Sequence, residues 1–106
     1  MRRYDHHEIA RALRALDSVC LEPRQIVLVG GAAVALHTCT PSGTQDIDHF
    51  PPDVDDLVAR CVAVNVKLPP FSAPGVLDYP WHSEDRLQRA LPELDKLQVV
   101  RRDRSG

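Results

Sequence analysis

The sequence predicts a small α/β domain of the α+β type, with a mixed β-sheet and helices packed on one side. At 106 residues the chain is long enough for one domain with a modest core and too short for two. Hydrophobic residues make up 43% of it and charged residues 26%, as in ordinary globular proteins. Short apolar runs bounded by Gly or Pro alternate with stretches in which apolar residues recur at helical spacing.

The first two elements are a helix and a strand. The helix is expected from Asp5 to Cys20, with Asp5 as its N-cap and Glu8 in the position of a capping-box partner. Pro23 then prevents the helix from continuing. The run from Gln25 to Val29 is apolar without alternation, which predicts a strand covered on both faces and central in its sheet.

The middle of the chain predicts helix, strand and helix. Ala32 to Cys39 is expected as a short helix, and Gln45 to Phe50 as the second strand, after a segment rich in turn residues. Asp53 is placed to cap a third helix, which Pro69 and Pro70 stop. The apolar face of this helix comprises Val54, Leu57, Val58, Cys61 and Val62.

The C-terminal third has a weaker pattern. Val76 to Tyr79 is expected as a short strand, Glu84 to Leu91 as one or two helical turns, and Leu97 to Val100 as the last strand. Residues 101–106 form a charged tail that is expected to fray, within a single domain covering residues 1–106.

Net charge, apolar runs and cysteine content indicate which kinds of partner and compartment to expect. The net charge of −2 argues against a chain that attracts nucleic acid through its overall charge. No apolar run approaches about 18 residues, so no membrane span is expected. Cys20, Cys39 and Cys61 are widely spaced and odd in number, which predicts buried free thiols in a reducing cytosol. The basic N-terminus lacks the apolar segment of a secretory signal, so a bacterial-type cytoplasmic protein is expected.

Gly30 and Gly31 stand where the first strand turns into a helix. Without a Cβ atom, they allow the backbone to approach a ligand closely, and a helix N-terminus favours an anion such as phosphate. Glycines required only by a tight turn would give the same pattern.

Asp46 and Asp48 form the second chemical motif. Residues two apart on a strand share a face, while Ile47 between them can anchor in the core. Two neighbouring carboxylates offer the hard oxygen ligands that Mg²⁺ prefers, particularly when substrate phosphates complete the coordination. Solvated aspartates at an exposed strand end are the alternative. By alternation, His49 faces away from the pair and is expected to be structural.

Together these residues resemble the polymerase-β-like nucleotidyltransferases, whose signature is an apolar strand, GG or GS, a helix and then DxD. Residues Val27 to His37 and Thr44 to Asp48 carry the likeness. They are most similar to small bacterial nucleotidyltransferase-like proteins related to the toxins of abortive-infection systems. The segment from Asp78 to Leu87 also resembles sequence found downstream in that group.

The resemblance implies transfer of a nucleotidyl group from an NTP to a hydroxyl on RNA, protein or a small molecule, with release of pyrophosphate. Gly30 and Gly31 would hold the triphosphate, Thr44 would sit at the strand entrance, and Asp46 and Asp48 would ligate Mg²⁺. The setting would be a toxin–antitoxin or phage-defence system, with an antitoxin or a homo-oligomer partner.

Three departures from the family pattern keep other interpretations open. The turn before DxD contains Pro41-Ser42-Gly43 where relatives commonly have an Arg, and the chain ends soon after Val100. The family also uses a third carboxylate on a later strand; Asp78 is the first candidate for this catalytic role and Asp103 the second. A degenerate relative that binds nucleotide or a partner protein is therefore an alternative. A third interpretation is an interaction domain in which GG and DxD coincide by chance.

Overall fold

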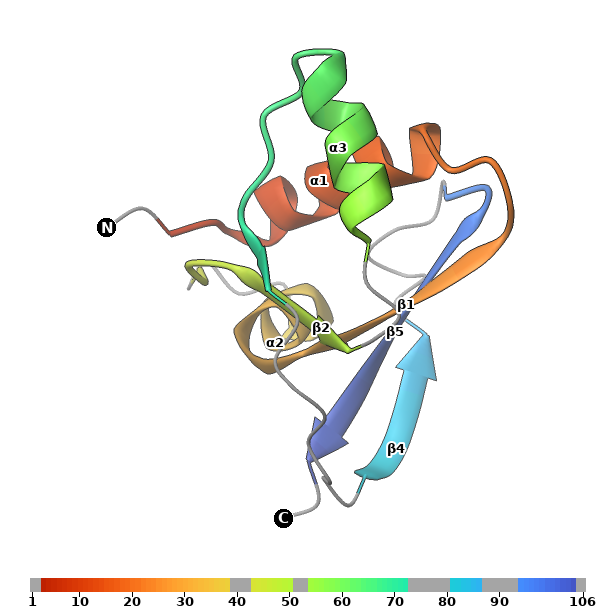
Figure 1. Ribbon diagram of the computed structural model, residues 1–106. Coiled ribbons are helices and arrows are strands. Elements are labelled where there is room, and N and C mark those ends of the chain that lie inside the picture. Colours follow the sequence, from red (N-terminus) through yellow and green to blue (C-terminus); the bar gives the residue numbers. More distant parts are fainter. Residues whose placement is uncertain (1–2, 39–42, 51–53, 73–80, 87–93, 105–106) are drawn as a thin grey trace.

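In the computed structural model, which describes residues 3–38, 43–50, 54–72, 81–86 and 94–104, three helices lie against a mixed five-stranded sheet (Figure 1). This is the α+β architecture that the sequence predicts. The helices are α1 (His6–Ser18), α2 (Gly30–Thr38) and α3 (Asp55–Ala63). The strands are β1 (Arg24–Val29), β2 (Ile47–Phe50), β3 (Phe71–Ser72), β4 (Trp81–Arg86) and β5 (Leu97–Arg104).

The strand order is β3-β2-β1-β5-β4, so the apolar β1 is central, as predicted. β1 runs antiparallel to β2 and parallel to β5. β3 adds to β2 in parallel, and β4 adds to β5 antiparallel. The first and last strands of the chain, β1 and β5, therefore lie side by side at the centre of the sheet.

Local signals account for the ends of the helices. At the start of α1, the Asp5 carboxylate accepts a hydrogen bond of 2.9 Å from the Glu8 backbone N–H, which confirms the predicted cap. α2 begins at Gly30, two residues earlier than expected, because a φ of +66° turns the chain directly from strand into helix. The predicted α3 cap, Asp53, lies outside the described residues, and Val54 at that helix end makes no side-chain cap bond.

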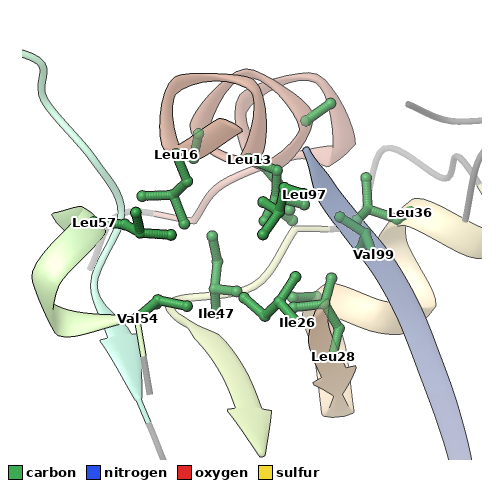
Figure 2. Close-up of a cluster of buried hydrophobic side chains, with 14 of the residues drawn as sticks. Leu13, Leu16, Ile26, Leu28, Leu36, Ile47, Val54, Leu57, Leu97 and Val99 are labelled. Atoms are coloured by element: carbon green, nitrogen blue, oxygen red, sulfur yellow. The ribbon is translucent and has the colours of Figure 1, made fainter. Parts of the chain in front are cut away.

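All three helices cover one face of the sheet. Figure 2 shows Leu13, Leu36 and Leu57, one from each helix, above Ile26 and other side chains of the sheet. Ile26 is fully buried, and burial of an aliphatic side chain of this size contributes about 1.5–3 kcal/mol.

The opposite face of the sheet has a second, smaller apolar cluster. Val27 from β1 and Val100 from β5 are 6% and 1% exposed, and Val29 packs against them. β1 is therefore buried on both faces, as its unbroken apolar run predicts.

Two predictions for the C-terminal third are wrong. Residues 84–86 belong to β4 instead of a helical turn, and residues 101–104 continue β5 where a frayed tail was expected. Both segments are polar, and their extended form comes from pairing with each other: the register sets Glu84 opposite Arg102 and Asp85 opposite Arg101. The strand predicted at 76–79 lies outside the described residues.

The predictions for the cysteines and for the apolar face of α3 are confirmed in part. Cys20 and Cys61 are buried free thiols, while Cys39 lies outside the described residues. Val62 is 61% exposed, so it does not share the buried face of α3 with Leu57 and Cys61. Within the described ranges, no helix combines the length and apolar character needed to cross a membrane.

Candidate functional site

The glycine turn brings the backbone of Gly30 close to the carboxylate of Asp48. Gly30 adopts a φ of +66°, a conformation that other residues rarely adopt. A Cβ atom at this position would lie 3.3 Å from Asp48 Oδ2. Asp48 can therefore approach the start of α2 because residue 30 has no side chain. The register of the sheet gives the same placement, since Asp48 pairs with Val29.

Gly31 makes room for Thr44. A Cβ atom on Gly31 would lie 2.8 Å from Thr44 Oγ1, closer than real Cβ contacts. Thr44 is held by an isolated antiparallel bridge to Tyr4, with N···O distances of 2.7 and 2.9 Å. Its hydroxyl donates a hydrogen bond of 3.1 Å to the Asp46 carbonyl oxygen. Thr44 thus packs against the start of α2 and also bonds the backbone of Asp46.

Asp46 and Asp48 lie side by side, although β2 begins one residue after Asp46, not at Gln45 as predicted. The Thr44 hydrogen bond holds Asp46 in a bend before the strand. Ile47, between the two aspartates, is fully buried in the core. Both carboxyl groups are half-buried, so the site combines partial exposure with a fixed backbone.

The surroundings oppose a negative charge on Asp48. Burial raises the pKa of Asp48 above its usual range, and the neighbouring Asp46 raises it further through charge repulsion and a hydrogen bond between the two carboxyl groups. A cation between the two groups would remove this repulsion. Two adjacent carboxylates are the type of donor set that Mg²⁺ uses, so the residues present fit this ion.

Ser72 is a member of the site that sequence reasoning missed. Its hydroxyl donates a hydrogen bond of 2.9 Å to Asp46 Oδ2. Ser72 lies in β3 directly beside Asp48, and the Ile47 backbone N–H bonds the Pro70 carbonyl oxygen at 2.8 Å. A two-residue strand is too short to give a periodic pattern; the preceding Pro69-Pro70, which favours extended chain, is the only signal in the sequence.

The candidates for a third carboxylate are not beside the pair in the described part of the chain. Asp78 lies outside the described residues. Asp103 belongs to β5, which is separated from β2 by β1, a distance of two strand spacings or about 10 Å. Within the described ranges, no group of three or more His, Cys, Asp or Glu residues could hold a metal ion. Among the described residues, the neighbouring carboxylates that could serve as ligands are therefore Asp46 and Asp48.

His49 has a structural position, as predicted. It is 1% exposed, and its ring lies edge-on to Phe71 with 6.1 Å between the ring centroids. It therefore fixes β3 against β2 from the core side of the sheet. A separate groove of about 730 Å³ lies between α1 and the residues after α3, and neither the glycines nor the aspartates line it.

No known protein family, curated protein or solved structure matches this chain. In the structure, a glycine turn, a threonine and a serine surround the two carboxylates.

Proposed function

We propose that the protein is a Mg²⁺-dependent nucleotidyltransferase that moves a nucleotidyl group from an NTP to a hydroxyl of RNA or protein. The observation that carries this proposal is the approach of Asp48 to Gly30, where an added Cβ atom would lie 3.3 Å from the carboxylate. A helix N-terminus that favours phosphate and a carboxylate pair that favours Mg²⁺ then serve one ligand, a metal–NTP complex.

Each residue has a defined task in this proposal. Asp46 and Asp48 would hold Mg²⁺, which neutralises negative charge on the phosphates. Gly30 and Gly31, whose missing Cβ atoms make room for Asp48 and Thr44, would hold the triphosphate at the start of α2, where the positive end of the helix dipole attracts an anion. Thr44 keeps Asp46 in place through its hydrogen bond to the Asp46 carbonyl oxygen.

The resemblance to abortive-infection toxins supports a toxin–antitoxin or phage-defence setting, with an antitoxin or a second copy of the chain as partner. The buried free thiols of Cys20 and Cys61 suit a reducing compartment, which supports a cytoplasmic location.

The test is transfer of label from each α-³²P-labelled NTP to total RNA or total protein in the presence of Mg²⁺. Asp46→Ala combined with Asp48→Ala should abolish transfer. The matched control is Glu22→Ala combined with Asp95→Ala, which removes two carboxylates from exposed positions and should leave transfer unchanged. Circular dichroism establishes that both double variants are folded. Transfer that persists without Asp46 and Asp48 would contradict the proposal.

A degenerate, nucleotide-binding protein is the second candidate. It is favoured by Ser72, an uncharged residue at the strand position beside Asp48, and by the absence of a third carboxylate near the pair within the described ranges. Calorimetric titration with Mg²⁺–NTP separates the two candidates. Binding that requires Asp46 and Asp48, without label transfer to any acceptor, would support the degenerate protein; absence of binding would contradict both.

A further inference from the structure

We propose that Ser72 is a positioning residue that sets the orientation of Asp46 for cation binding. The inference rests on the proposed function, because it concerns the same carboxylate pair. The Ser72 hydroxyl lies 2.9 Å from Asp46 Oδ2, in a partly buried environment. The bond joins residues 26 positions apart in the sequence, so it depends on the fold.

The backbone of Ser72 is fixed from two sides. In the sheet, Phe71 pairs with Ile47 and Ser72 pairs with Asp48. On the core side, the Phe71 ring packs against His49 and against the apolar core. The hydroxyl therefore reaches Asp46 from a residue paired within the sheet, whereas Asp46 itself lies in the bend before β2. The Ser72 hydrogen bond therefore restricts the rotation of an Asp46 side chain that lies outside the regular strand.

The hydroxyl suits this task chemically. It donates one hydrogen bond to Oδ2, so a cation that replaces the hydrogen bond between the Asp46 and Asp48 carboxyl groups could use the remaining lone pairs of Oδ1 and Oδ2. It also adds no charge to a site where Asp46 and Asp48 already repel each other. Partners of this kind hold metal-binding carboxylates in position, and their loss typically weakens metal binding by about 10–100-fold.

A structural role alone would give a different result. If the hydrogen bond only attached β3 to β2, its loss would lower thermal stability and leave cation affinity unchanged. Cation affinity of the folded protein, measured without nucleotide, is therefore the readout that distinguishes positioning from packing.

The experiment is titration of the full chain with Mn²⁺, followed by electron paramagnetic resonance of the free ion. Ser72→Ala should bind Mn²⁺ about 10-fold more weakly than the wild type, and Ser72→Thr, which keeps the hydroxyl, should bind normally. Ser72→Val has the shape of the Thr variant without the hydroxyl and should match Ser72→Ala. The matched control is Ser18→Ala, which removes a hydroxyl that donates to the Ala15 carbonyl oxygen on α1.

The outcomes separate this inference from the proposed function. Equal Mn²⁺ affinity of the Thr and Val variants would overturn the positioning role of Ser72. In that case, Mn²⁺ binding by the wild type that depends on Asp46 and Asp48 would still support the metal site. If Ser72→Ala fails to fold, the Thr and Val pair gives the same comparison. Absence of Mn²⁺ binding by the wild type, or binding that survives Asp46→Ala with Asp48→Ala, would overturn both the inference and the metal site.

Discussion

At Gly30 and Gly31, a side chain would meet the site directly. An added Cβ atom would lie 3.3 Å from Asp48 Oδ2 at the first position and 2.8 Å from Thr44 Oγ1 at the second. The positive φ of Gly30 adds backbone strain of roughly 1–2 kcal/mol for any other residue. A turn alone would require the first glycine, whereas the second is required by contact with Thr44. Both glycines are therefore required by the packing of Asp48 and Thr44 around the start of α2.

Asp48 should lower the stability of the cation-free protein. Burial and the nearby Asp46 raise its pKa, so its charge is held at a cost in the folded state. Asp48→Asn keeps the shape and removes the charge, and we expect the melting temperature at neutral pH in EDTA to rise by roughly 2–5 °C. The measurement is thermal denaturation followed by circular dichroism.

The exposed Asp95→Asn serves as the control and should leave the melting temperature unchanged. A wild type that is as stable as Asp48→Asn would show that the two carboxylates tolerate each other without a cation. The proposed nucleotidyl transfer should also be lost in Asp48→Asn, because an amide is a weaker ligand for Mg²⁺ than a carboxylate.

At the scale of elements, Asp17 connects the end of α1 to the start of β5. Its carboxylate accepts backbone hydrogen bonds from Asp95, Lys96 and Leu97, with shortest distances of 3.0, 2.7 and 2.8 Å respectively. Arg24 of β1 then donates its backbone N–H to the Lys96 carbonyl oxygen at 3.0 Å. One carboxylate therefore sets where β5 begins beside β1.

Asp17→Ala should lower the free energy of unfolding by about 2–3 kcal/mol, because it leaves backbone donors without their charged acceptor. Burial alone would raise the pKa of Asp17, but the three backbone donors outweigh it and the net pKa is lowered. A lowered pKa gives stability that is present above the unfolded value and is lost as pH falls through the folded value. Chemical denaturation from neutral pH to acid should therefore show the wild type and Asp17→Ala converging at low pH.

Asp56→Ala is the matched control for this prediction. Asp56 pairs with Arg24 at 2.7 Å, which lowers the pKa of Asp56 to about 2, but the two side chains are 45% and 32% exposed. Solvent screening limits such a pair to less than about 1 kcal/mol. An Asp17 variant no less stable than the Asp56 variant would contradict the role assigned to Asp17.

Sequence reasoning succeeded where the signal was local. The α1 cap joins Asp5 to Glu8 three residues later, and the unbroken apolar run of β1 is enough to place it in the centre. Residues 84–86 are predicted to be helical, whereas pairing with β5 makes them part of β4. The same holds for the candidate site. The spacing of the glycines and aspartates is visible in the sequence, whereas the contact of Ser72 with Asp46 joins residues 26 positions apart.

On the scale of the whole molecule, the last strand, β5, pairs with the first strand, β1, at the centre of the sheet. β5 pairs with β1 from Arg24↔Leu97 to Leu28↔Arg101, and β4 then depends on β5 for its place (Figure 1). Asp46, Asp48 and Ser72 lie on the other side of β1, in β2, in β3 and in the bend before β2, while Gly30 and Gly31 begin α2. β5 is therefore connected to the carboxylate pair only through β1, which lies between β5 and β2.

Truncation after Val100 tests this dependence. It removes the part of β5 that pairs with β4 from Trp81 to Asp85, together with the Leu28↔Arg101 pair. We expect β4 to lose hydrogen-exchange protection and the melting temperature to fall by on the order of 10 °C, because β5 is the one described strand with which β4 pairs. Truncation after Arg104 is the control, since it keeps every strand pair described and should leave both measurements unchanged. Full protection of residues 81–86 in the shorter chain would show that the segment after Val100 is the frayed tail its composition suggests.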